Sequence, residues 1–167
     1  VCILAMILIG GSLALAAPQV TIADAPSAAG TWLTGSFFST GGFGSYDVTG
    51  LGGLDVAKDL TIAPVARSLA LSAGYSRVAS GAPIATVADP VELQPEARKP
   101  IDITLAAVSG GGQRGVLEFG DGATLRTEAG GKLTLAASEA LYVGGTLDAP
   151  GGSITLKLTK KAPEGAA

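Results

Sequence analysis

Short segments in which apolar and polar residues alternate recur along the chain. The clearest are residues 132–136 and 153–158, and similar segments occur at 60–62 and 68–71. Because residues two apart on a strand point to the same face, each segment predicts a strand with one face in a core and the other face outward. Helical periodicity is nearly absent, and the single stretch that fits it, residues 136–141, is too short to be stable as a helix. The pattern therefore predicts an all-β protein.

One short motif occurs three times: two glycines, a small or polar residue, and then apolar residues at alternate positions. The copies begin at Gly10, Gly130 and Gly151, so the last two are 21 residues apart. A period of about 20 to 25 residues is typical of one coil of a β-solenoid. The glycines and Pro150 fit the corners of such a coil, where the backbone needs a positive or a fixed φ. We therefore expect a fragment of a right-handed parallel β-helix.

The pattern divides the chain into four regions. Between Pro83 and Pro100 lie four of the nine prolines. Since proline removes a hydrogen-bond donor from a strand, this segment predicts an inserted loop that projects from the solenoid. The regions are residues 1–30, solenoid strands or a signal-like apolar segment; 31–82, an aromatic and glycine-rich β region; 83–100, the proline-rich loop or linker; and 101–167, solenoid coils.

The apolar start of the chain has two interpretations. Residues 1–17 are mainly apolar and end in small residues, as in a signal peptide, but they lack the positive start of one, and Gly10 and Gly11 interrupt them. A membrane span would need about 18 uninterrupted apolar residues. We favour buried strand over signal remnant. The only cysteine, Cys2, supplies neither a disulfide framework nor a metal-binding pair.

Five of the eight aromatic residues lie within residues 31–53. Large aromatic side chains contribute most when buried, so we expect them to fill or cap the core while the glycines make the bends. The alternative is an exposed aromatic surface that binds a sugar or a host protein. The five residues are Trp32, Phe37, Phe38, Phe43 and Tyr46.

The composition excludes much chemistry. The chain has no histidine, which removes Ser-His nucleophile pairs, imidazole metal sites and histidine-ligated haem. A net charge of -3 gives little electrostatic support for binding nucleic acid.

Carboxylate pairs remain as candidate chemistry, because β-helical scaffolds can carry sites that cleave polysaccharides. The candidates are Asp55 with Asp59 and Glu118 with Asp121, and neighbouring coils can bring further acids close to them. We favour the interpretation that these acids are solvated strand ends and corners. The chain is thus expected not to be an enzyme, and to have no catalytic residue, no metal site and no cofactor.

Two stretches resemble a known family. Residues 120–125 and 144–156 resemble the repeat region of filamentous haemagglutinin-like large exoproteins, and residues 41–50 followed by 60–64 resemble a region found well along such chains. The resemblance implies an internal or carboxyl-side fragment of a two-partner secretion adhesin. Such a protein is carried through a dedicated outer-membrane transporter and is secreted or displayed on the surface of a Gram-negative bacterium. Its partner is a host or bacterial surface receptor or a glycan.

The chain also departs from this family. The asparagine-proline motifs of the family's secretion domain are absent, since the chain has no asparagine. No Arg-Gly-Asp tripeptide occurs, because Arg114 and Gly115 are followed by Val116. The resemblance therefore transfers no functional residue to this chain.

The expected function is a structural shaft segment of a secreted, surface-displayed filamentous adhesin. Three alternatives stay open: the stalk of a contact-dependent growth-inhibition toxin, a β-helical polysaccharide-cleaving enzyme, and a haem-acquisition protein. For haem, the only candidate ligands are Tyr46, Tyr75 and Tyr142.

Overall fold

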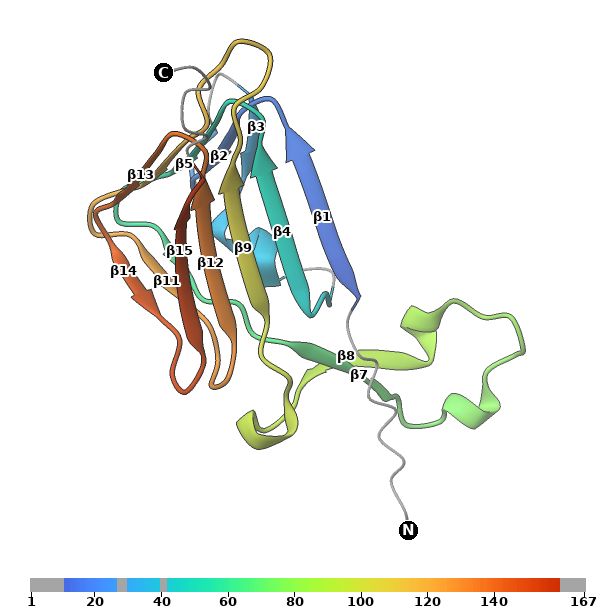
Figure 1. Ribbon diagram of the computed structural model, residues 1–167. Helices are drawn as coiled ribbons and strands as arrows, with labels where there is room; N and C mark the ends of the chain where they lie inside the picture. The colour runs from blue at the N-terminus through green and yellow to red at the C-terminus, as the bar shows by residue number, and fades with distance from the viewer. Residues whose placement is uncertain (1–10, 27–29, 40–41, 160–167) are drawn as a thin grey trace, which may run out of the picture.

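The chain folds around one core enclosed by three parallel β-sheets (Figure 1). This architecture comes from a computed structural model, which describes residues 11–26, 30–39 and 42–159. The expectation of an all-β fold with parallel sheets is confirmed for these residues. Their helices are four short 3-10 turns, none of which could cross a membrane: η1 (Gly35–Ser39), η2 (Tyr75–Arg77), η3 (Ile84–Thr86) and η4 (Pro95–Ala97).

The strands fall into three sheets, which we label A, B and C. Sheet A contains, in spatial order, β1 (Ser12–Ala17), β4 (Ser45–Gly50), β9 (Asp102–Ala107), β12 (Lys132–Ala137) and β15 (Ser153–Leu158). Sheet B contains β13 (Ala140–Val143), β10 (Val116–Phe119), β5 (Gly53–Val56), β2 (Val20–Ile22) and β3 (Thr31–Leu33). Sheet C contains β14 (Thr146–Asp148), β11 (Thr124–Arg126) and β6 (Thr61–Ile62).

The chain visits the sheets in the order A, B, C and then returns to A, and we call each such passage a circuit. The complete circuits are β4–β5–β6, β9–β10–β11 and β12–β13–β14. Strands of successive circuits pair in parallel, so equivalent residues stack in rows. One row in sheet A is Leu13, Tyr46, Ile103, Leu133 and Ile154. The strands of the three copies, β1, β12 and β15, thus lie in one sheet and in the same register, as their shared pattern predicts.

The alternation along each strand decides which side chains form the core. On β9 and β12, Ile103, Leu105, Leu133 and Leu135 are fully buried, whereas the residues between them are partly exposed on the outer face. Burial of each such side chain contributes about 1.5–3 kcal/mol. Thr127, at the turn after β11, is a buried polar residue whose hydroxyl donates a 2.6 Å hydrogen bond to the Ile101 carbonyl.

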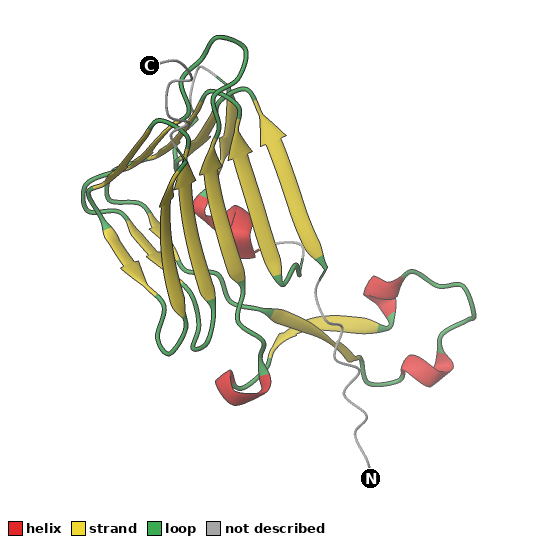
Figure 2. Ribbon diagram, viewed as in Figure 1, coloured by secondary structure: helices red, strands yellow, loops and turns green. Residues whose placement is uncertain are grey.

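After β6 the chain leaves the three sheets and forms a projecting arm, residues 67–92 (Figure 2). Its strands β7 (Arg67–Leu71) and β8 (Ala88–Glu92) pair only with each other, in an antiparallel hairpin. The strand expected at 68–71 therefore exists but belongs to the arm rather than to the body. The expected boundary between residues 82 and 83 falls inside the arm, which begins before the proline-rich segment. Pro90 is compatible with β8 because a strand of a two-stranded hairpin has a free edge.

Aromatic rings close the amino-side end of the core. Phe38 on η1 is fully buried, and its ring lies 5.3 Å from that of Tyr46 in an edge-to-face contact. The rings of Phe37 and Phe43 also contact Tyr46, both at 5.8 Å. Packing as the main role of these aromatics is confirmed. Phe37 and Phe43 are partly buried, and Trp32 is the most exposed of the five, with its indole N–H donating to the Ala23 carbonyl at 2.8 Å.

The apolar start of the chain is only partly covered by these findings. Residues 12–17 form the edge strand of sheet A, so a strand is confirmed for that part, but of these residues Ala17 alone is buried. Residues 1–10, including Cys2, lie outside the described residues, so the signal-peptide alternative concerns a segment that the structure does not describe.

Candidate functional site

The candidate carboxylates meet across circuits rather than along the chain. Asp55 on β5 and Glu118 on β10 occupy paired positions on the outer face of sheet B, and Tyr142 on β13 is the next residue of that row. Both acids point outward because Leu54 and Leu117, which precede them, are fully buried. The expectation that neighbouring coils bring acids together is confirmed for this pair. The pairs expected from the sequence joined residues of one corner, whereas parallel stacking joins Asp55 to Glu118.

The other two candidates, Asp59 and Asp121, meet at the corner between sheets B and C. The Asp59 backbone N–H donates to the Asp121 carbonyl at 3.0 Å. The Lys58 ammonium lies 3.4 Å from an Asp121 carboxylate oxygen, and both side chains are largely exposed. The corner requires glycine at position 122, where φ is +71° and a Cβ would lie 2.2 Å from an Asp59 carboxylate oxygen.

Of these residues, Lys58, Glu118, Asp121 and Tyr142 line an open groove of about 560 Å³ on the outer surface, whereas Asp55 and Asp59 are not part of its lining. Its polar groups are two carboxylates, one ammonium and one phenol, which can hydrogen-bond a polar ligand. Catalytic acids usually depend on burial for their reactivity, whereas Glu118 and Asp121 are exposed. The arrangement therefore favours surface contact over acid-base chemistry. The groove is formed by Lys58, Glu118, Phe119, Gly120, Asp121, Tyr142, Val143 and Gly144.

The three tyrosines proposed as haem ligands lie in separate parts of the fold. Tyr46 is buried among the phenylalanines, and burial raises its pKa, which a backbone hydrogen bond at Phe43 partly offsets. Its phenolate is therefore disfavoured as a ligand. Tyr75 lies on the arm and Tyr142 on β13, and both are exposed. No shared haem pocket results from these positions.

A second site lies where the arm returns to the body. The Arg98 side chain is only 9% exposed and forms ion pairs with Glu92 of the arm and Glu128 of the body, the latter at 2.6 Å. Within the described residues, Arg98 Nε and Glu128 Oε2 are buried without a hydrogen-bond partner. Removing one member of a buried ion pair leaves the other charge uncompensated, so this cluster holds the arm against the body.

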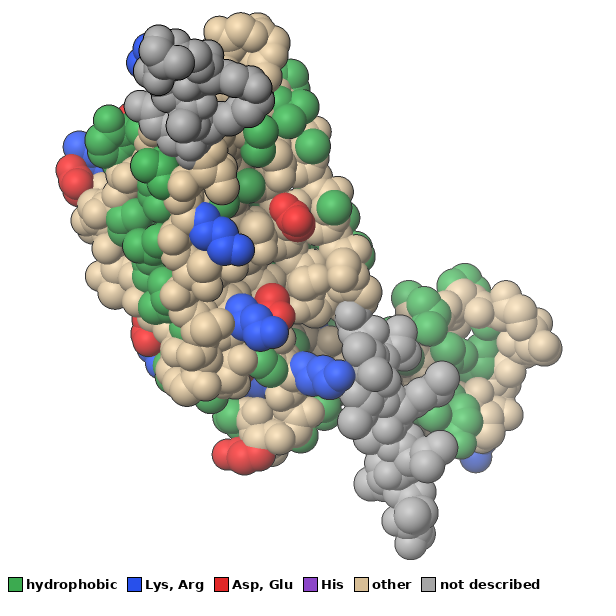
Figure 3. Space-filling model, in the orientation of Figure 1, with side chains coloured by type: hydrophobic (Ala, Val, Ile, Leu, Met, Phe, Trp, Pro, Cys, Tyr) green, Lys and Arg blue, Asp and Glu red, His purple; other side chains and the backbone are tan. Residues whose placement is uncertain are grey.

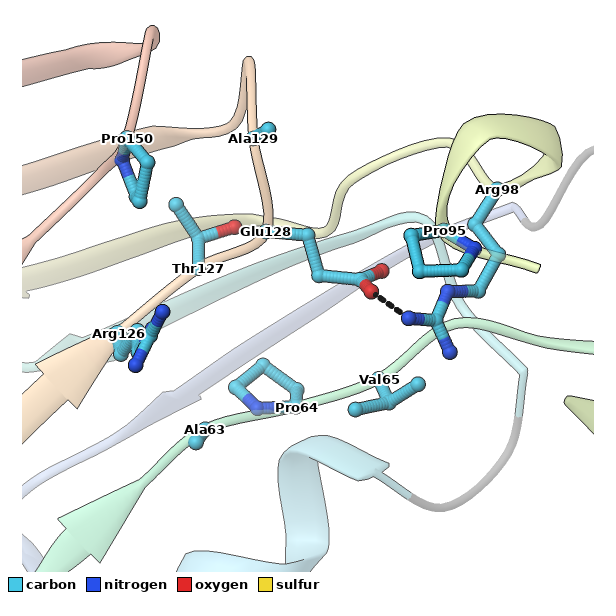
Figure 4. Close-up of a pocket in the computed structure, with 10 residues that line it drawn as sticks. All are labelled: Ala63, Pro64, Val65, Pro95, Arg98, Arg126, Thr127, Glu128, Ala129 and Pro150. Atoms are coloured by element: carbon cyan, nitrogen blue, oxygen red, sulfur yellow. Dashed lines mark ion pairs between the residues drawn. The ribbon is translucent and has the colours of Figure 1, made fainter. Parts of the chain in front are cut away.

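Beside this ion pair lies a cleft of about 390 Å³ (Figure 4). Its walls come from equivalent corners of three circuits and from Pro95 and Arg98, which follow the arm. Sequence reasoning did not identify this cleft, because the only local signal was a group of charges among prolines. The lining residues are Ala63, Pro64, Val65, Pro95, Arg98, Arg126, Thr127, Glu128, Ala129 and Pro150.

Neither site has the composition of a metal centre. In the part of the chain that the structure describes, no three His, Cys, Asp or Glu side chains gather where they could hold an ion.

Comparison of the chain with protein-family models, with curated proteins and with solved structures finds no significant match.

Proposed function

We propose that this chain is a shaft segment of a secreted, surface-displayed filamentous adhesin, and that its circuits wind as a right-handed parallel β-helix. The observation that carries the proposal is the continuity of the core rows from one circuit to the next. Ile103, Leu133 and Ile154 stack in a single row, and the strands of each circuit pair with those of its neighbours. A core of this kind grows in one dimension, so the length of the rod increases with the number of circuits.

The remaining features support a role in contact rather than catalysis. The arm carries exposed apolar side chains, which Figure 3 shows gathered away from the body, among them Leu71, Tyr75 and Ile84. The groove at Glu118 offers polar groups to a receptor or glycan. The resemblance of residues 120–156 to haemagglutinin-like repeats suggests delivery by an outer-membrane two-partner secretion transporter to a Gram-negative cell surface.

Deleting one full circuit tests the shaft role. Removal of residues 132–152 joins Gly131 to Ser153 and places Ile154 where Leu133 paired with Ile103, so the rows stay intact. In the bacterium that carries the gene, this variant is expected to retain surface display, measured by antibody labelling of intact cells, and adherence to host cells.

The matched control deletes one residue fewer, 132–151. That variant places Ser153 in the core row and turns Ile154 outward, because a shift of one residue exchanges the two faces of a strand. Surface display is expected to fall sharply. If both deletions behave alike, the stacked core does not carry the function.

A separate assay distinguishes the enzyme alternative. The purified chain is incubated with polysaccharides, and reducing ends are measured for the parent and for Glu118→Gln. Release of sugar by the parent and its loss in the variant would replace the adhesin proposal with a polysaccharide-cleaving one.

A further inference from the structure

The outer face of sheet B carries one continuous row of aromatic, hydroxyl and carboxylate side chains. The row crosses all five strands of the sheet (Figure 1), because parallel pairing places one outward residue of each strand beside the next. Neighbouring strands lie about 4.8 Å apart, so the row is about 19 Å long. It lies on a face of the sheet, so a further circuit at either end would lengthen the row without covering it. In spatial order its residues are Trp32, Thr21, Asp55, Glu118 and Tyr142.

Two carboxylates lie side by side in this row without a matching cation. Asp55 and Glu118 are paired residues of β5 and β10, and like charges in such positions repel each other. Among the described residues, no Lys or Arg forms an ion pair with either acid. Lys58, which lines the groove beside Glu118, pairs with Asp121 instead. The Gln19 side chain donates to an Asp55 carboxylate oxygen at 3.4 Å, which neutralises no charge. The two negative charges therefore favour a positively charged partner.

Aromatic rings lie on both sides of the two carboxylates. Tyr142 is the neighbour of Glu118 and is 60% exposed, and Trp32, at the other end of the row, is 36% exposed. The hydrogen bond from the Trp32 indole to the Ala23 carbonyl holds that ring in place. The faces of Trp and Tyr rings attract cations, so the rings favour the same kind of partner as the carboxylates.

The shape of the surface decides which cation fits it. In the part of the chain that the structure describes, no three side chains gather as ligands for a metal ion. A small organic cation would need a concave pocket that buries most of its surface. The row instead runs over the open face of a sheet, and the groove at its Glu118 end is also open. An extended chain with several cationic side chains can cover such a row. Arginine fits best, because its planar guanidinium pairs with carboxylates through two hydrogen bonds and also stacks on aromatic rings.

We propose that this row is a docking surface for an extended, arginine-rich segment of a partner protein. Guanidinium groups of that segment pair with Asp55 and Glu118, and further guanidinium groups stack on Tyr142 and Trp32. The inference goes beyond the shaft role, because it names the chemistry of a partner. Binding to the purified chain is measured without surface display, so the two proposals fail independently.

The first test follows the fluorescence anisotropy of labelled hexaarginine, hexalysine and hexaglutamate as the purified chain is added. Hexaarginine is expected to bind more tightly than hexalysine, because an ammonium group forms neither the paired hydrogen bonds nor the stacked contact. Hexaglutamate is expected not to bind, and the affinity for hexaarginine is expected to fall as the salt concentration rises. Absence of hexaarginine binding, or equal binding of hexalysine, would overturn the proposal.

The second test removes the two charges with little change of shape, by Asp55→Asn together with Glu118→Gln. The dissociation constant for hexaarginine is expected to rise at least about tenfold, because the charge-assisted hydrogen bonds are lost. The matched control, Asp47→Asn together with Glu96→Gln, removes two exposed acids of β4 and η4. It is expected to change the constant by less than about twofold, since exposed charges far from the row are screened by salt. Equal weakening in both double variants would show that net charge, and not the row, attracts the probe.

The third test addresses the aromatic part of the row through Tyr142→Ala. The dissociation constant for hexaarginine is expected to rise about two- to fivefold, as for the loss of an exposed cation–π contact. Circular dichroism checks that each variant keeps the fold of the parent chain. An unchanged constant in Tyr142→Ala would contradict the proposed role of the rings.

A chitosan hexamer, which carries amino groups on a sugar backbone, is the competing probe. It is expected to bind more weakly than hexaarginine, because its ammonium groups cannot stack on the rings as guanidinium groups do. Tighter binding of the chitosan hexamer would replace the protein partner with a cationic glycan and overturn the proposal.

Discussion

The same rows of apolar residues run from one end of the core to the other, yet the two ends differ in how far these residues are covered. Leu13 and Leu15 at the amino side are partly buried and pack against the core. Ile154 and Leu156, in the same two rows at the other end, are about half exposed. A circuit buries its apolar residues only when it has a neighbour on both sides, so the end circuits need something else to cover them. At one end the chain supplies four aromatic rings, and at the other no described residue covers the row.

The largest expected effect is at the closed end. Phe38→Ala is expected to lower the free energy of unfolding by about 3–5 kcal/mol, because the ring is fully buried and its loss leaves a cavity. The control Tyr142→Ala, an exposed aromatic at the open end, should change it by no more than about 0.5 kcal/mol. Urea unfolding followed by circular dichroism gives both values. Similar losses in the two variants would mean that Phe38 does not close the core.

The second prediction compares one row in two neighbouring circuits. Leu135→Ala is expected to lower the free energy of unfolding by about 2–5 kcal/mol because Leu135 is fully buried. Leu156→Ala, its partner on the edge strand, is expected to cost less than about 1 kcal/mol. The same unfolding measurement applies, at a protein concentration too low for self-association. Equal costs would show that residues beyond those described cover the open end.

The third prediction concerns the glycine corners. Gly122→Ala is expected to lower the free energy of unfolding by about 1–2 kcal/mol, because the added Cβ strains a left-handed backbone and the exposed Asp59 carboxylate must rotate away from it. Gly151, near the open end, has a φ of +61°, and no atom lies within 4 Å of an added Cβ. Gly151→Ala is therefore expected to lower the free energy of unfolding by about 1 kcal/mol. A double-mutant cycle with Asp59→Gly should recover part of the Gly122→Ala loss and none of the Gly151→Ala loss.

The smallest effect appears only at high pH. Burial raises the pKa of Tyr46 in the folded chain above its ordinary value of 10.0. The folded state therefore retains its proton where the unfolded state loses it, so this contribution to stability is complete below pH 10 and is lost as the pH rises through the folded pKa. Tyr46→Phe should reduce the loss of stability between pH 9 and 11, measured by urea unfolding at each pH. The matched control is Tyr142→Phe, which changes an exposed tyrosine, and equal changes in the two variants would contradict the prediction.

The candidate sites were only partly predictable from the sequence. The sequence predicted that Asp55, Asp59, Glu118 and Asp121 lie at strand ends and corners. The structure places Asp59 and Asp121 at a corner, whereas Asp55 and Glu118 lie within β5 and β10 on the outer face of sheet B. Their pairing was not identifiable, because it depends on how far the chain travels between circuits. The ion pair of Arg98 with Glu128 was hidden for the same reason, since Arg98 lies in the segment that follows the arm and Glu128 at a corner of the body.

The sequence by itself determined the local structure of this protein. Alternating apolar residues specify strands with one buried face, and repeated glycine pairs specify corners, because both depend on neighbours along the chain. The equivalence of Leu133 and Ile154 follows from the repeated glycine motif alone. Only the tertiary structure decided that residues 67–92 form an arm, that one end of the core is closed while the other is open, and which acids become neighbours. Each of these depends on contacts between distant segments, and the free energy of such contacts is set by packing and register rather than by local sequence.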